Sequence, residues 1–211
     1  MTKRLIGLTG GIATGKSTVA NYLATTYNLP ILDADIYARE AVSVGSPILA
    51  QIAQHYGKEI LLPDDNLNRL KLGEIIFNQP EERDWVENII HPYVRNCFSQ
   101  AIHESSANTL VLVIPLLFEA GLENLVSEIW VVSCSAEQQK QRLIQRNNLT
   151  DEQAAARINS QLAITEKIAR ADVVLDNSSS LESLLQQVDE VMKSRTFNLR
   201  SPSESGKEVR R

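Results

Sequence analysis

One short segment constrains the fold of this chain more than any other. Residues 10–17 read GGIATGKS and match the pattern G-x-x-x-x-G-K-[ST] at every fixed position. In that pattern, backbone N–H groups surround the phosphates of a nucleotide, the lysine reaches the β and γ oxygens, and the serine hydroxyl becomes a ligand of Mg²⁺. The pattern requires a strand before it and a helix after it.

Both neighbouring segments meet this requirement. Residues 3–9 read as a buried parallel strand, and Val19 and Leu23 lie one helical turn apart in the segment that follows. A dinucleotide-binding loop needs G-x-G-x-x-G, which is excluded because no two glycines are two positions apart. We therefore predict a phosphate loop that binds nucleotide and, through Ser17, Mg²⁺; its binding residues are Gly11, Ile12, Ala13, Thr14, Gly15, Lys16, Ser17 and Thr18.

The composition limits the class of molecule. The chain has 211 residues, which suggests one domain with insertions. A net charge of -5 and a pI near 5.3 give no support for a nucleic-acid partner. No apolar run approaches the ~20 residues that span a bilayer, and no signal-type segment precedes the first strand. Cys97 and Cys134 suit reduced core thiols. We expect a cytoplasmic protein without a membrane partner; a monomer and a homo-oligomer remain equally open.

Five apolar runs alternate with helical patterns along the chain, which predicts an α/β fold with a parallel sheet. The runs cover residues 4–9, 29–32, 110–114, 128–133 and 172–175. Two intervening segments are too long for a simple crossover helix. We predict a core of residues 1–34, 109–134 and 171–195, a helical substrate-binding insertion at 35–108, a helical segment at 135–170 and a disordered tail at 196–211.

Two carboxylates follow the second predicted strand. Asp33 and Asp35 would lie at the carboxyl edge of the sheet, where ligands of such folds bind. Transfer of a phosphoryl group to an alcohol needs in-line positioning, neutralisation of charge and a group that accepts the hydroxyl proton. Asp33 is our candidate for this base. Asp35 is expected to cap the following helix.

The third predicted strand lacks the carboxylate that would serve as a second Mg²⁺ ligand, because Val113 and Ile114 occupy its end. Mg²⁺ would then be held by Ser17, nucleotide phosphates and water, with Asp33 or Glu119 as further candidates. An alternative for Glu119 is that its charge opens a helix.

The segment 135–170 carries arginines at helical spacing. Arg142 and Arg146 share one helix face, and Arg157 and Gln161 repeat that spacing on the next helix. Together they could form a hairpin lid that closes over the transferring phosphoryl group. The alternative is a solvated, charged hairpin. Upstream of this segment, Pro92 is expected to start a new helix after His91.

Taken together, these motifs resemble the dephospho-CoA kinase family. The resemblance follows residues 7–17, 33–39, 91–95, 115–119, 141–146, 156–161 and 171–177 in order, and it covers residues 1 to about 195. It implies transfer of phosphate from ATP to the ribose 3'-hydroxyl of dephospho-CoA. It also implies a three-layer α/β/α P-loop fold with strand order 2-3-1-4-5, a CoA-binding insertion and a mobile lid.

The resemblance further implies roles for single residues. Asp33 would be the base, Lys16 and Arg142 would contact the ATP phosphates, Arg157 would act from the lid, and Asn177 would lie near the adenine. The residues that it places at the acceptor are Thr9, Asp33, Tyr37, Arg39, His91, Arg95, Leu116 and Glu119.

Two positions depart from the family pattern. Ala13 stands where glycine is usual, and a positive φ there would cost alanine about 1 kcal/mol or more; we expect ATP binding to survive. Val113 stands where many relatives have aspartate. The alternative functions are another P-loop kinase, acting on a nucleoside monophosphate, shikimate or gluconate, and a regulatory nucleotide switch. The N-K-x-D and D-x-x-G strings of guanine-specific switches are absent.

Overall fold

The computed structural model describes residues 3–198 and builds them around a five-stranded parallel sheet. The strand order is β2-β3-β1-β4-β5, which confirms the α/β fold and the expected order. The second strand starts two residues later than predicted, at Ile31. The strands are β1 (Arg4–Gly10), β2 (Ile31–Asp33), β3 (Thr109–Val113), β4 (Glu128–Ser133) and β5 (Val173–Asp176).

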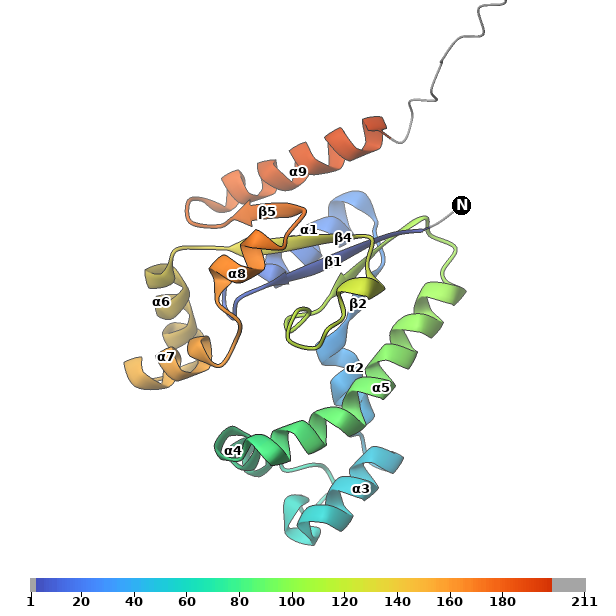
Figure 1. Cartoon of the computed structure of the whole chain (residues 1–211), viewed down its shortest axis with the longest axis vertical. Coiled ribbons are helices and arrows are strands. Elements are labelled where there is room, and N and C mark those ends of the chain that lie inside the picture. The colour runs from blue at the N-terminus through green and yellow to red at the C-terminus, as the bar shows by residue number, and fades with distance from the viewer. Residues whose placement is uncertain (1–2, 199–211) are drawn as a thin grey trace, which may run out of the picture.

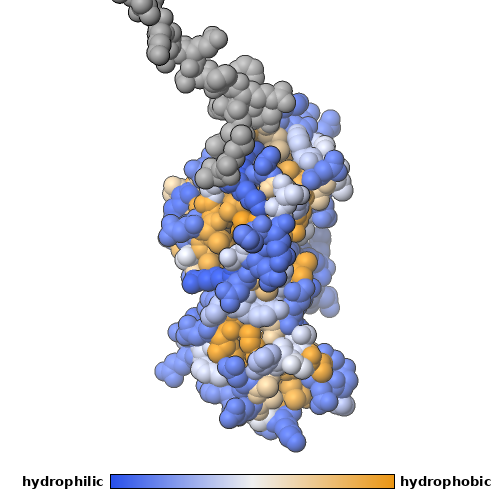
Figure 2. Space-filling model, turned by 90° about the vertical axis from the view of Figure 1, so that its right-hand side faces the viewer, coloured by the Kyte–Doolittle hydropathy of each residue, from blue (hydrophilic) through white to orange (hydrophobic). Residues whose placement is uncertain are grey.

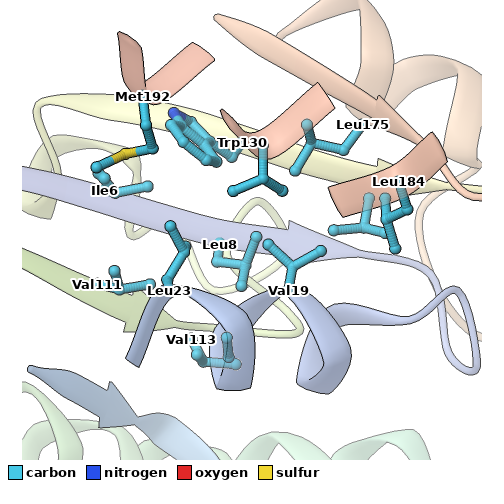
Figure 3. Close-up of a cluster of buried hydrophobic side chains, with 13 residues drawn as sticks. Ile6, Leu8, Val19, Leu23, Val111, Val113, Trp130, Leu175, Leu184 and Met192 are labelled. Carbon is cyan, nitrogen blue, oxygen red and sulfur yellow. The ribbon is translucent and has the colours of Figure 1, made fainter. Parts of the chain in front are cut away.

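Helices α1 (Lys16–Tyr27) and α9 (Leu181–Asn198) cover one face of the sheet (Figure 1). Alternate residues of each strand point to this face because side chains in a strand have a period of two. Ile6 and Leu8 of β1 therefore meet Val19 and Leu23 of α1, while Trp130 of β4 packs beneath α9 (Figure 3). Burial of each such side chain stabilises the fold by about 1.5–3 kcal/mol.

The other face is covered by α2 (Ala34–Ala41), the second half of α5 (Pro80–Glu104) and α8 (Ile164–Ala169). Phe98 of α5 is fully buried there against the strands. Gly7 of β1 also faces this side. A Cβ at Gly7 would lie 2.9 Å from both Leu117 and Val126, so the missing side chain lets the segment after β3 pack on the strand.

A second group of helices extends away from the sheet along the long axis of the molecule (Figure 1). It consists of α3 (Pro47–Tyr56), the 3-10 turn η1 (Lys58–Ile60), α4 (Arg69–Asn78) and the first half of α5. This lobe has its own core, formed by Val42, Leu49, Ile52, Ile60, Leu67, Leu72 and Val86. Its surface and that of the sheet region both show separate hydrophobic patches among hydrophilic side chains (Figure 2).

The prediction that Pro92 starts a new helix is wrong. Pro92 lies inside α5, which continues from Pro80 to Glu104. Proline removes one helical hydrogen bond and tends to kink a helix, and α5 changes direction along its course (Figure 1). The helix persists because both halves are anchored, with Val86 in the lobe core and Phe98 under the sheet.

Between β4 and β5, α6 (Ala136–Asn147) and α7 (Asp151–Asn159) form a helical hairpin. Its turn is set by Asn148, which has φ 51°, and by a capping box between Thr150 and Gln153. The 3-10 turn η2 (Glu123–Leu125) precedes β4.

Helix α9 continues through Asn198, so it includes the first three residues of the predicted tail; residues 199–211 lie outside the described part of the chain. Within residues 3–198, no helix is long and apolar enough to cross a membrane.

Candidate active site

The phosphate loop, residues 10–17, joins the end of β1 to the start of α1. Gly10 and Gly15 have φ 143° and 110°. A Cβ at Gly10 would lie 2.2 Å from the carbonyl oxygen of Val132, and one at Gly15 would lie 2.4 Å from Asn177 Nδ2. Glycine is therefore required at both positions.

Ala13 has φ 61°, so it adopts the left-handed conformation that alanine tolerates poorly. This conformation costs alanine about 1–2 kcal/mol of conformational energy.

Lys16 reaches back over the phosphate loop. Its Nζ donates to the carbonyl oxygens of Gly11 at 2.7 Å and Gly10 at 3.1 Å. Burial, together with the positive charge of Lys167, lowers the pKa of Lys16 to about 8, although the carboxylate of Asp35 opposes the shift. Phosphate oxygens bound by a glycine-rich loop lie close to its backbone, so an ammonium held there is placed to contact them.

Asn177 connects the loop to the segment after β5. Asn177, just after β5, donates through Nδ2 to the carbonyl oxygen of Thr14 at 2.8 Å. Arg142 of α6 donates to the carbonyl oxygen of Asn177 at 3.1 Å. The expected position of Asn177 near an adenine remains a prediction.

A cavity of about 560 Å³ opens over the phosphate loop. It brings together the loop, the start of α2, the end of β3 and the face of α6 that carries arginines. The lining residues are Ile12, Ala13, Gly15, Lys16, Ser17, Thr18, Asp35, Pro115, Leu116, Arg142, Arg146 and Gln161. Arg157 does not line this cavity but a groove between α7 and α4.

Asp33 is the last residue of β2, and Asp35 lies in the first turn of α2. The prediction that Asp35 caps α2 is wrong, because Asp33 is the N-cap and its Oδ1 accepts from the backbone N–H of Asp35 at 2.8 Å. Asp35 instead lies in the first turn and lines the phosphate cavity. Partial desolvation, with the negative charge of Asp33, raises the pKa of the Asp35 carboxyl.

A second cavity of about 360 Å³ lies between α2, α4 and α5. Arg39 and Arg69 line it among apolar side chains, and Asp35 lines both this cavity and the phosphate cavity. Of the residues that the resemblance places at the acceptor, Arg39 is at this cavity and Leu116 is at the phosphate cavity.

The other expected acceptor residues on α2 and α5 make protein contacts. The Tyr37 ring packs edge-on against Phe98 at 5.2 Å. Arg95 donates to the carbonyl oxygen of Ala120 at 3.2 Å, and His91 is half-buried on α5. Tyr37, His91 and Arg95 therefore lie on helices that border the second cavity, but their side chains do not line it.

Thr9 and Glu119 hold the segment after β3 in place. Thr9 is fully buried and donates to the carbonyl oxygen of Pro115 at 3.2 Å. Glu119 Oε1 accepts from the backbone N–H of Leu162 at 2.9 Å and lies 2.8 Å from Lys167 Nζ. The idea that Glu119 opens a helix is wrong, because residues 115–121 form turns.

Sequence reasoning missed Lys167, which is fully buried beside the site, and Gln139, which contacts the phosphate loop. Both lie in polar helical segments, where spacing alone gives no signal for burial. The expectation of core thiols is also wrong, since Cys97 and Cys134 are free but only partly buried. Val113 and Ile114 are buried as the sequence indicated, so β3 offers no carboxylate at the loop.

Comparisons with known proteins agree with this geometry. The profile of the family described as dephospho-CoA kinase matches residues 4–183. The chain is 71% identical over 189 residues to the dephospho-CoA kinase of Trichormus variabilis, an alignment that spans 90% of this chain and 96% of the relative.

Solved structures agree as well. The dephospho-CoA kinase from Campylobacter jejuni superposes with a TM-score of 0.69 at 30% identity, covering 94% of this chain and all of the other (100%). Shikimate kinase from Acinetobacter baumannii matches with a TM-score of 0.55 at 15% identity, covering 95% and 97% of the two chains, and so shares the fold alone. With its phosphate loop, its sheet order and these relatives, the chain belongs to the dephospho-CoA kinase family.

Proposed function

We propose that this protein transfers the terminal phosphoryl group of ATP to the ribose 3'-hydroxyl of dephospho-CoA, which gives coenzyme A and ADP. Family membership supports the reaction. The structural observation that carries it is the arrangement of two cavities around one residue. Asp35 lines both the phosphate cavity and the cavity against the helical lobe, so a donor and an acceptor bound in the two would meet there.

ATP is assigned to the phosphate cavity. The phosphate loop and Lys16 line this cavity, and in this motif backbone N–H groups and the lysine ammonium bind the β and γ phosphates. Arg142 lines the same cavity and would neutralise charge that develops during transfer. Arg157 lies across the groove from α4, so its assigned contact requires the α6–α7 hairpin to move as a lid.

Mg²⁺ fits the oxygen groups in this cavity. The exposed hydroxyl of Ser17 at the start of α1 and the carboxylate of Asp35 line the same space. Hard oxygen ligands of this kind suit Mg²⁺, which keeps several waters and takes the remaining oxygens from phosphates. Bound there, Mg²⁺ would neutralise phosphate charge. Glu119 is a weaker candidate ligand because its Oε1 is engaged by Lys167 and Leu162.

The proposed transfer step needs a proton acceptor for the 3'-hydroxyl. The hydroxyl oxygen attacks the γ phosphorus in line, its proton passes to Asp33, and the bond to the ADP oxygen breaks. Hydrogen bonding of Asp33 Oδ1 to the N–H of Asp35 fixes the orientation of the carboxylate. Its Oδ2 accepts no hydrogen bond within the described part of the chain, so this oxygen is available to the substrate.

Acceptor binding is assigned to the second cavity and the helices around it. Arg39 and Arg69 would meet the diphosphate of dephospho-CoA, since paired guanidinium groups suit phosphate. Thr9, Tyr37, His91, Arg95 and Leu116 are assigned to the surroundings of the acceptor. We further propose a cytoplasmic location, which fits the use of ATP and the free thiols of Cys97 and Cys134.

Substitution of Asp33 by Asn tests the proposed base. Asparagine is as good an N-cap as aspartate, so α2 should remain folded. We expect turnover with dephospho-CoA to fall by about 10² to 10⁴, the usual contribution of a general base, with little change in ATP affinity. ADP release, coupled to an optical assay, measures turnover, and calorimetry measures ATP binding. A loss of less than about tenfold would contradict the role of Asp33.

Asp35→Asn is the matched control, because this variant removes the neighbouring carboxylate, which lines both cavities, whereas Asp33 lines neither. We expect it to weaken Mg²⁺-dependent nucleotide binding more than it lowers turnover at saturation. A larger turnover loss than that of Asp33→Asn would move the base to Asp35.

Shikimate, gluconate and AMP, supplied as acceptors to the wild-type protein, should give no comparable ADP release. Turnover with one of them instead of dephospho-CoA would overturn the proposed function.

A further inference from the structure

Two glutamine side chains from outside the phosphate loop hold Ile12 from opposite sides. Gln161, after α7, accepts through Oε1 from the backbone N–H of Ile12 at 2.9 Å. Gln139 of α6 donates through Nε2 to the carbonyl oxygen of Ile12, also at 2.9 Å. Gln139 is buried, with 6% of its surface exposed, and its side chain also occupies the space beside Gly11. Ile12 therefore has both backbone polar groups bound by side chains.

These contacts act on the strained position of the loop. The carbonyl group of Ile12 belongs to the peptide plane that precedes Ala13, so its orientation helps to set the φ angle of Ala13. Ala13 has φ 61°, whereas an alanine left to itself favours negative φ. Gln139 binds this peptide directly, whereas Gln161 binds the N–H of the preceding peptide, between Gly11 and Ile12. Without the two glutamines, the loop would lose the contacts that hold both peptides and would tend to relax at Ala13.

The segment that follows the α6–α7 hairpin is also bound to the turns after β3. Leu162, the residue after Gln161, donates its backbone N–H to Glu119 at 2.9 Å. Glu119 is in turn bound to the fully buried Lys167. Residues 161–162 are therefore bound both to the phosphate loop and to the segment after β3. The second contact fixes the backbone position from which Gln161 binds Ile12.

We propose that Gln139 and Gln161 are positioning residues that keep the phosphate loop in its ATP-binding conformation by holding the peptide groups on the two sides of Ile12 while Ala13 stays left-handed. The inference rests on the proposed ATP site. Gln161 also lines the phosphate cavity, so direct contact with ATP is the competing explanation for any effect of its removal. The two explanations differ in how the effect depends on residue 13, because glycine adopts positive φ without strain.

The test is a set of ATP dissociation constants, measured by calorimetry for Q139A, Q161A, A13G and the double variants that combine A13G with each glutamine change. We expect each glutamine variant to raise the dissociation constant about three- to tenfold, the usual contribution of one hydrogen bond. In the A13G background the same change should have a clearly smaller effect. Thermal unfolding confirms that each variant is folded.

Gln141→Ala is the control on α6, since Gln141 is exposed and bonds only to Glu137 of the same helix; it should leave ATP binding unchanged. Equal losses for Q161A in the wild-type and A13G backgrounds would overturn the proposal in favour of direct contact, and unchanged binding in Q139A and Q161A would overturn it outright. Failure of the wild-type protein to bind ATP would instead overturn the proposed ATP site itself.

Discussion

At the scale of single residues, the site is built from groups held in unfavourable states. Ala13 has a positive φ, and Lys16 is a partly buried amine whose pKa is lowered to about 8. Each state is maintained by neighbours, through the two glutamines that hold Ile12 and the loop carbonyls that accept from Lys16. Bound ATP would raise the pKa of Lys16 again, because phosphate oxygens stabilise a charged lysine.

The pKa of Lys16 makes ATP binding dependent on pH. In the ATP-free protein the amine is charged below pH 8 and loses its proton as the pH rises through about 8. Since phosphate favours the charged form, binding above pH 8 must take up a proton. We expect the ATP dissociation constant to rise by up to about tenfold per pH unit there. Calorimetry in buffers of different ionisation enthalpy measures both the affinity and the proton uptake.

Lys16→Arg provides the control for this pH dependence. A guanidinium group stays charged throughout the range, so this variant should bind ATP more weakly but with a flat profile between about pH 7 and 9.5. A wild-type dissociation constant that stays constant across the same range would contradict the link to Lys16.

At the scale of elements, an ion pair between Lys167 and Glu119 links helix α8 to the segment after β3. Lys167 is fully buried, whereas the Glu119 side chain is 24% exposed. A buried charge that loses its partner destabilises a protein strongly, while a partly exposed carboxylate can be solvated. The two partners should therefore respond differently to substitution.

Glu119→Ala leaves Lys167 with only the carbonyl oxygen of Pro115 as a partner, at 3.4 Å. We expect this variant to lose about 3–5 kcal/mol of unfolding free energy. Lys167→Met, which replaces the ammonium by an apolar group, should lose much less. Urea unfolding measures both. Glu123→Ala, which breaks the more exposed pair with Arg170, is the control and should lose at most about 1 kcal/mol. Equal losses for Glu119→Ala and Glu123→Ala would contradict the assignment.

At the scale of the whole molecule, the proposed lid and the helical lobe face each other across a groove of about 760 Å³ between α7 and α4. Arg69 and Gly73 line both this groove and the second cavity, which in turn shares Asp35 with the phosphate cavity. The three spaces therefore adjoin one another in order from the phosphate loop to the lobe. Phe77 is 64% exposed on the lobe side of the groove.

This connection predicts where ligands slow hydrogen exchange. A non-hydrolysable ATP analogue together with dephospho-CoA should slow amide exchange in α4 and α7, because closure of the groove removes water from both helices. Each ligand at about 100 times its dissociation constant stabilises by about 2.7 kcal/mol, so the two together set the upper limit of the effect at roughly 10⁴-fold. Exchange in α9 serves as the internal control. Equal slowing of α4 by the ATP analogue alone would contradict the need for both ligands.

The sequence by itself determined the phosphate loop, the parallel sheet and the family, because these features are local. Gly10, Gly15, Lys16 and Ser17 stand at fixed spacing, and the buried strands appear as apolar runs. Periodicity failed at Pro92, where packing of both halves of α5 overrides the local preference of proline for a helix start.

Only the tertiary structure decided which polar groups meet across long separations. The burial of Lys167 against Glu119 and the contacts of Gln139 and Gln161 with Ile12 depend on how the helices dock on the sheet. A hydrogen bond between residues far apart in the chain leaves no periodic pattern, because its partners become neighbours only after the apolar faces have packed.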